Sequence, residues 1–187
     1  MRQEDGRKLL GLARKSIESY FSKKDVDFSA YKNYSDKQGV FVTLNRKGRL
    51  RGCIGFPYPT LPLYQAVFEA ARAAAFEDPR FNPVKKEELK DIDIEISVLT
   101  VPEEIEAKPE DRPKLVRIGK DGLIIQSTFG SGLLLPQVFT EYHCTPERAL
   151  EMTCQKAGLP DDAWKDKENK VLRFQATIFS EKEEKKR

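Results

Sequence analysis

The residue with the most direct capacity for chemistry is Cys53, which stands between two glycines in the segment LRGCIG at positions 50–55. On an extended strand alternate side chains share a face, so Arg51, Cys53 and Gly55 are expected to point the same way. A guanidinium about 7 Å away along the backbone would favour the thiolate, and Gly55 would leave room beside the sulfur. The pattern predicts a reactive thiol, and a buried, inert cysteine is the alternative.

A carboxylate and a hydroxyl lie on the polar side of the most regular strand pattern, DIDIEISVLT at positions 91–100. Aliphatic residues alternate with polar ones there, which predicts a strand with one buried face. If this strand neighbours the strand at 49–56, Glu95 and Ser97 would converge with the thiol and the guanidinium. Glu95 is then a candidate base or hydrogen-bond acceptor, and a solvated strand face is the alternative.

Other arrangements with catalytic or binding potential are weaker. His143 is the only histidine of the chain and could serve as the base for Cys53, but a lone histidine in a loop is more often a surface residue. A zinc site built from His143 and the three cysteines lacks a short chelating pair, so we expect no metal and no cofactor. The basic segment NRKGRLR at 45–51 is more typical of a solvated hairpin tip than of a nucleic-acid site.

The elements that must position these residues follow from hydrophobic periodicity and turn residues. Thr60 is the expected N-cap of the second helix, and Asp121-Gly122 is the expected turn of a second β-hairpin. The charged, proline-containing segment 101–113 is the expected boundary between two subdomains. The predicted helices cover residues 4–22, 60–78 and 145–158, and the predicted strands include 39–44, 49–56, 91–100 and 170–180.

Composition places the chain among water-soluble globular proteins. Its 33 lysines and arginines nearly balance 30 aspartates and glutamates, so the net charge of +3 provides no strong field for nucleic acid or an anionic membrane. Three cysteines without a CxxC pair, and a charged start without an apolar signal region, predict reduced thiols and a cytoplasmic location. No apolar run approaches the roughly 20 residues that span a bilayer, so we expect no membrane association.

Six segments of the chain form a recognisable set: GVFVTL, LRGCIG, DPRF at 78–81, EISVL, GLLLPQV and TCQKAGL. Together they resemble the AMMECR domain family, from about Ala13 to Phe179. The resemblance implies a mixed α and β fold of two subdomains with a cleft between them. Relatives are encoded alone or beside a Memo-like protein and a radical SAM protein, as protein A of the AmmeMemoRadiSam system, which implies these two partners and a modification pathway.

The resemblance also marks positions for a site. Asp78 and Arg80 are among them, and for this pair a loop-stabilising contact is the alternative to ligand binding. We expect Cys53 and Glu95 to be the catalytic candidates. The expected ligand-binding residues are Arg51, Gly52, Gly55, Asp78, Arg80, Phe81 and Ser97.

The predicted fold is α+β, a mainly antiparallel sheet with packed helices in a single AMMECR-type domain over 1–187. A larger subdomain of about 1–100 plus 166–187 and a smaller one of about 101–165 would leave a cleft near Cys53. The sequence predicts a cleft enzyme or a protein that binds a small molecule or peptide there. An adaptor for Memo-like or radical SAM partners is the main alternative, and an RNA-binding module is disfavoured.

Overall fold

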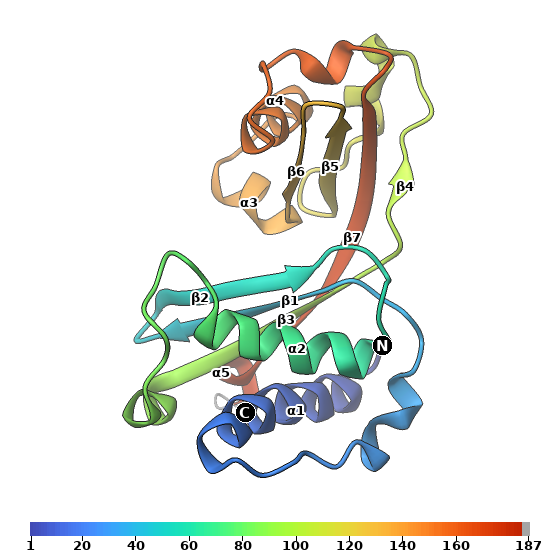
Figure 1. The fold of residues 1–187 in the computed structure, drawn as a ribbon. Helices are drawn as coiled ribbons and strands as arrows, with labels where there is room; N and C mark the ends of the chain where they lie inside the picture. The colour runs from blue at the N-terminus through green and yellow to red at the C-terminus, as the bar shows by residue number, and fades with distance from the viewer. Residues whose placement is uncertain (185–187) are drawn as a thin grey trace. The chain divides into compact units, whose positions relative to one another are not determined.

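The computed structural model describes residues 1–184, which form helices and mainly antiparallel strands in two compact units (Figure 1). The first unit comprises Met1–Leu99 together with the chain from Thr177 onward, and the second comprises Thr100–Ala176. The α+β class is therefore as predicted. All of the candidate site residues fall in the first unit.

Three antiparallel strands form the sheet of the first unit in the order β2-β1-β3. Strand β1 spans Val40–Arg46, β2 spans Arg49–Phe56 and β3 spans Ile92–Leu99. β7, at Lys170–Ser180, follows β3 in the strand order and runs from the second unit into the first. Because β1 is central, it connects the edge strand that carries Cys53 to the strand that carries Glu95.

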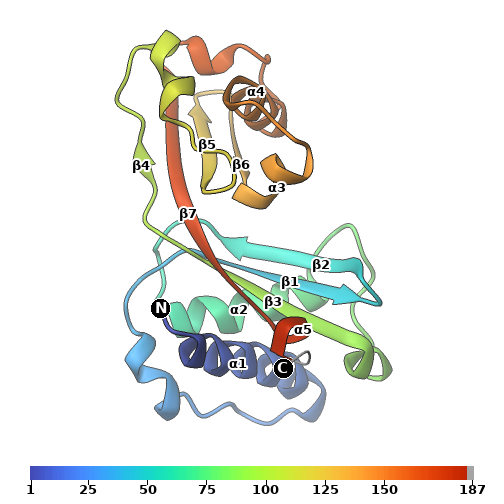
Figure 2. The ribbon, with the colours of Figure 1, turned by 180° about the vertical axis from the view of Figure 1, so that it is seen from behind.

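Two helices cover one face of this sheet, α1 at Gln3–Ser22 and α2 at Leu63–Phe76 (Figures 1 and 2). The inward face of α2 is rich in alanine, which allows the helix backbone to approach the strands closely. Aliphatic side chains of β1 and β3 complete a dry core with those of the helices. Shorter elements of this unit are η1 at Ser29–Tyr34, η2 at Lys86–Asp91 and α5 at Glu181–Glu184.

The second unit has its own core between a sheet in the order β4-β7-β5-β6 and helix α4. Gly130 and Gly132 of β6 allow this packing, since a Cβ atom at either position would collide with backbone of the α4 C-terminal end. The elements are β4 at Glu103–Glu104, η3 at Pro109–Leu115, β5 at Asp121–Ser127, β6 at Gly130–Leu134, α3 at Pro136–Glu141, α4 at Pro146–Lys156 and η4 at Ala163–Lys165.

Most of the predicted elements are confirmed, but the predicted turn at Asp121-Gly122 is wrong. These two residues begin β5, and the hairpin turns at residues 128–129 between β5 and β6. The Asp121 carboxylate is fully buried and accepts a hydrogen bond of 3.0 Å from the backbone N–H of Arg117, so it closes the preceding turn. Gly122 is required there because a Cβ atom would enter the ring of Phe174.

The predicted N-cap of α2 is also wrong. The residue that precedes the first helical turn is Pro62 rather than Thr60, and no side chain caps this helix end. A backbone bond replaces the side-chain cap, since the N–H of Leu63 donates to the carbonyl oxygen of Asp36 at 3.0 Å. By contrast Thr145 caps α4 as predicted, and its hydroxyl accepts from the N–H of Arg148.

Candidate functional site

The site begins at the β1–β2 hairpin, which fixes the face on which Cys53 lies. Lys47 and Gly48 form the turn with positive φ values of 51° and 77°. Gly52 faces α2, where a Cβ atom would collide with the carbonyl oxygen of Ala74. Cys53 is the next residue along the strand, so its side chain lies on the opposite face of the sheet, away from the helices.

A thiol, a hydroxyl and a carboxylate form a row across three strands on that face. Thr43 of β1 is the register partner both of Cys53 on β2 and of Glu95 on β3. The predicted convergence required the strands of Cys53 and Glu95 to be direct neighbours. They are not, because β1 lies between them and places Thr43 between the two side chains. Ser97 lies in the adjacent row, opposite Phe41, and is buried.

The Cys53 thiol is held in its protonated form. The Thr43 hydroxyl donates a hydrogen bond of 3.3 Å to the sulfur. Burial nevertheless raises the pKa of the thiol above its ordinary value, and the carboxylates of Asp78 and Glu95 act in the same direction against Thr43 and Arg80. Thiolate is the nucleophilic form, so the resting protein presents a neutral thiol at pH 7.

A loop after α2 covers the outer edge of β2 at Cys53. The backbone N–H of Cys53 donates to Oδ2 of Asp78 at 2.8 Å, and Nη2 of Arg80 donates to the Cys53 carbonyl oxygen at 3.3 Å. Both backbone groups point outward, so Cys53 and Thr43 form a non-hydrogen-bonded pair, in which side chains approach most closely. The loop thus protects an edge strand and fixes the thiol against the hydroxyl.

Asp78 and Arg80 are also tied to each other. Nε and Nη2 of Arg80 donate to the two carboxylate oxygens of Asp78 at 2.9 and 2.7 Å, and the backbone N–H of Arg80 donates as well, at 3.1 Å. These hydrogen bonds, together with the one from Cys53, hold the pKa of Asp78 well below its usual range despite its burial. The carboxylate is therefore charged at all pH values where the protein is expected to work.

Phe81 completes the loop between two guanidinium groups. The Arg80 guanidinium lies 5.5 Å from the centre of the Phe81 ring and that of Arg51 lies 6.0 Å from it, both within the range of a cation–π contact. The ring therefore links the DPRF loop to the strand that carries LRGCIG.

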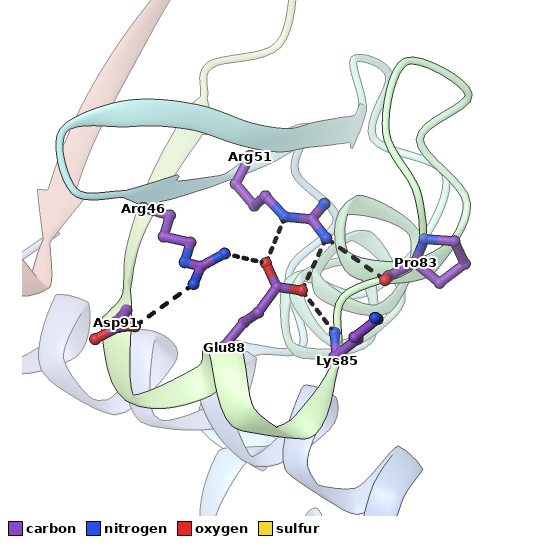
Figure 3. A network of polar contacts seen from close by, with 6 residues as sticks. All are labelled: Arg46, Arg51, Pro83, Lys85, Glu88 and Asp91. Atoms are coloured by element: carbon purple, nitrogen blue, oxygen red, sulfur yellow. Dashed lines mark hydrogen bonds and ion pairs between the residues drawn. The ribbon is translucent and has the colours of Figure 1, made fainter.

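Arg51 is held by Glu88 (Figure 3). Nε and Nη2 of Arg51 donate to the two carboxylate oxygens of Glu88, each at 3.0 Å, and Arg46 donates to the same carboxylate at 2.8 Å. The backbone N–H of Lys85 adds a bond of 2.8 Å. Arg51 thus pairs with a carboxylate and does not stabilise a Cys53 thiolate. Two of the four cations in NRKGRLR, Arg46 and Arg51, are paired with Glu88.

The family model AMMECR1 matches residues 10–179 of the chain. The chain belongs to the AMMECR1 family. A protein of Thermococcus gammatolerans is 50% identical over 97% of this chain and 92% of its own length, and one of Methanothermobacter thermautotrophicus is 50% identical over 96% and 95%. The crystal structure of the uncharacterized protein PH0010 from Pyrococcus horikoshii is similar, with a TM-score of 0.91 and 47% identity over 97% of this chain and 93% of that one.

In this AMMECR1-family chain, most of the predicted site residues lie around one segment. Arg51, Cys53, Asp78, Arg80 and Phe81 are linked by the contacts described above, whereas Glu95 and Ser97 lie two strands away on the same sheet. The predicted free space at Gly55 is wrong. A Cβ atom there would collide with the Val40 carbonyl oxygen and the Phe41 ring, so this glycine permits close strand packing.

The other reactive residue types lie in the second unit. His143 is exposed with φ 49°, and Cys144 and Cys154 are buried. Within residues 1–184, no three histidine, cysteine, aspartate or glutamate side chains are grouped so that they could hold a metal ion. None of the helices in the same range has the length and apolar character needed to cross a membrane.

Sequence reasoning missed Thr43 and Glu88. Thr43 is one polar residue in the apolar strand GVFVTL, and its partners follow only from the strand register. Glu88 is one of two adjacent glutamates in KKEELKD, and only its neighbour Glu87 is exposed. The available signal was the basic hairpin at 45–51, which requires an acidic partner wherever its arginines are not solvated.

Replacing Glu88 with glutamine is expected to lower the free energy of unfolding at pH 7 by about 2 kcal/mol, because the half-buried Arg46 and Arg51 would lose their shared carboxylate. Hydrogen bonds from Arg51 and from the Lys85 N–H, with the charges of Arg51 and Arg46, lower the pKa of Glu88 from 4.5 to about 2 despite its burial. A depressed carboxylate pKa stabilises the folded state above the unfolded pKa, and this contribution is lost as the pH falls through the folded value. The difference between wild type and E88Q should therefore shrink between pH 4.5 and about 2.

Urea unfolding at pH 7 and pH 3 measures this difference. Glu87→Gln is the matched control, since the side chain is exposed and adjacent, and its cost should stay within about 0.5 kcal/mol. Equal costs for the two substitutions would contradict a specific role for Glu88.

Proposed function

We propose that this chain binds a small polar molecule or a peptide over the row formed by Cys53, Thr43 and Glu95, and that Cys53 is the reactive group of the site. The observation that carries the proposal is the register that aligns these side chains on the sheet face opposite α1 and α2. A thiol, a hydroxyl and a carboxylate together offer donors and acceptors for a polar ligand. The family resemblance implies a modification pathway, and a reactive thiol would suit a protein of such a pathway.

The electrostatics of the row support a thiol that becomes nucleophilic only after a ligand binds. Two carboxylates, Asp78 and Glu95, oppose ionisation of Cys53, so a cationic or strongly hydrogen-bonding ligand that offsets their charge would lower the thiol pKa. Glu95 is the proposed acceptor for the thiol proton. Arg51 is then a residue that holds the strand in place through Glu88, and it does not contact the ligand in this proposal.

Labelling of the native protein with a thiol-specific reagent tests the proposal. Cys53 should react slowly at pH 7, and its rate should rise about tenfold per pH unit up to a pKa above that of an ordinary cysteine, about 8.5. The Cys53→Ser protein identifies which signal belongs to this thiol, because Cys144 and Cys154 are buried. Labelling only on unfolding would show that Cys53 is a packing residue and would overturn the proposed site.

Two neighbours provide variants with opposite expected effects. Thr43→Val removes the donor that lowers the thiol pKa, so labelling at pH 8 should slow. Glu95→Gln removes a negative charge that raises the pKa, so labelling should accelerate. Changes in the same direction for both variants would indicate altered access to the thiol and would contradict the proposed electrostatics.

A second candidate function is an adaptor for a Memo-like or radical SAM protein, and the hairpin tip favours it. Lys47, Arg49 and Leu50 are exposed there, with Leu50 44% exposed, while Arg46 and Arg51 anchor the base through Glu88. LRGCIG would then be the structural base of a docking surface. Co-purification that survives Cys53→Ser but is lost on Arg49→Glu would support the adaptor over the ligand-binding site.

A further inference from the structure

The outer side of α2 carries a row of three aromatic residues and one arginine, none of which belongs to the proposed site. Tyr64, Phe68, Arg72 and Phe76 follow one another at intervals of four, so they lie on one face of the helix. This face adjoins the C-terminal end of α1 and residues 23–28 rather than the sheet. The aromatic positions are half-buried, so the row lies at the surface of the first unit.

The guanidinium of Arg72 lies against two rings of this surface. Its central carbon is 5.6 Å from the ring centre of Tyr20 and 5.6 Å from that of Phe68. Tyr20 in turn stacks on Phe76 at 3.9 Å with an interplanar angle of 23°, and Phe28 contacts Phe68 at 5.1 Å. We call this arrangement the Arg72 ladder. Its members are Phe76, Tyr20, Arg72, Phe68, Phe28 and Tyr64.

Arg72 forms no ion pair with any residue in the described part of the chain. Other arginines with buried or partly buried side chains have polar partners: Arg14 pairs with Glu181, Arg51 with Glu88, and Nη1 and Nη2 of Arg112 donate to backbone carbonyls. Residues 1–184 supply no carboxylate or carbonyl to the Arg72 guanidinium. A guanidinium stacked on rings keeps its N–H donors in its own plane, where they are available to an external acceptor.

A hollow of about 780 Å³ opens beside the ladder. Three cations line it, Arg72, Lys23 and Lys24, against the single carboxylate of Asp25. The lining therefore carries two net positive charges. The adjoining hollow of about 410 Å³ shares Lys24 and Asp25 with this one and adds Lys15, Glu18 and Asp27, so the excess of positive charge lies on the side of Arg72 and Lys23.

We propose that the hollow beside the Arg72 ladder binds the phosphate group of a small phosphate ester. A planar guanidinium donates two parallel hydrogen bonds to adjacent phosphate oxygens, and the two lysines add point charges. The net charge matches a phosphate dianion better than a carboxylate monoanion. The Tyr20 side chain, which is 50% exposed, provides an apolar contact for the organic part of the ester.

Titration of the native protein with phenyl phosphate, followed by backbone amide NMR and calorimetry, tests this proposal. Binding should shift resonances of residues 19–28 and 68–76, and benzoate should bind at least fivefold more weakly than phenyl phosphate. Arg72→Gln should weaken phenyl phosphate binding at least tenfold. Arg49→Gln removes an exposed arginine at the β1–β2 hairpin and should leave binding unchanged.

A second variant, Lys24→Gln, tests the site even if Arg72→Gln disrupts the packing of the aromatic rings. Lys24 is exposed and takes no part in the ring contacts, so Lys24→Gln should weaken binding severalfold with unchanged thermal stability. Equal affinity in wild type, Arg72→Gln and Lys24→Gln would overturn the proposal, as would stronger binding of benzoate. The site is independent of Cys53, so Cys53→Ser should bind phenyl phosphate normally whether or not the thiol site proves correct.

Discussion

Gly52→Ala is expected to lower the free energy of unfolding by about 3 kcal/mol or more. The Cβ atom would collide with the Ala74 carbonyl oxygen of α2, a backbone atom that cannot move aside as a flexible side chain could. Relief requires α2 and β2 to separate, and separation would open the alanine-rich interface that packs the helix on the sheet. Urea unfolding monitored by circular dichroism measures the loss.

Gly11→Ala is the matched control for this substitution. Gly11 lies in α1 with no atom within 4 Å of an added Cβ, so alanine should stabilise the protein by about 0.5–1 kcal/mol through its higher helix propensity. The two glycines therefore predict shifts of opposite sign. A mild effect of Gly52→Ala would mean that β2 and α2 are less tightly packed than the structure has them.

Local patterns predicted the elements of the first unit because each pattern is decided by near neighbours. NRKG encodes the turn between β1 and β2, and the alternation of isoleucines encodes β3. The N-cap of α2 could not be predicted in the same way. Thr60 has the right side chain, but the N–H of Leu63 takes its partner from Asp36, a residue distant in sequence.

The candidate site was predicted as a set of residues but not as an arrangement. Sequence spacing placed Arg51 beside the thiol on one face of a regular strand, but the register of β1 and β2 shifts by one residue at Arg51, so the alternation that the prediction required is interrupted there. The side chain is long, however, and the half-buried carboxylate of Glu88 offers it two hydrogen bonds at 3.0 Å. Sequence separation hides such partners, because Arg51 and Glu88 meet only when β2 and η2 fold together.

Ion pairing of the neighbouring arginines explains why Cys53 rests as a neutral thiol. The expected thiolate required a nearby free cation, whereas the cations of this region are paired, Arg51 with Glu88 and Arg80 with Asp78. The sulfur is buried near two carboxylates, and both conditions raise the thiol pKa. The hydrogen bond from the Thr43 hydroxyl lowers this pKa by less, so the net shift is upward. Ion pairing at the edge of β2 is therefore linked to thiol chemistry, since any ligand that displaces Arg80 from Asp78 changes both.

Asp78→Asn is expected to lower the free energy of unfolding by about 2–3 kcal/mol, chiefly because backbone donors lose a charged acceptor. Asp78 is 4% exposed and accepts from the N–H groups of Cys53 and Arg80 as well as from the Arg80 guanidinium. Asparagine retains one acceptor oxygen, and its amide N–H₂ would face a guanidinium that can only donate. The outer edge of β2 would lose its cover, so Cys53 should also label faster.

Arg80→Gln removes the other half of the pair and should cost no more than about 1 kcal/mol, because the Arg80 side chain is 54% exposed and water replaces its contacts. The contrast follows from geometry: Asp78 holds backbone groups of two segments together, whereas Arg80 mainly orients Asp78. Unfolding of both variants at pH 7 measures the contrast, with Asp111→Asn as a control at a partly exposed aspartate whose ion pair with Lys114 is at the surface. Equal losses for the two would mean that the ion pair itself, and not the backbone hydrogen bonds to Asp78, fixes the position of Cys53.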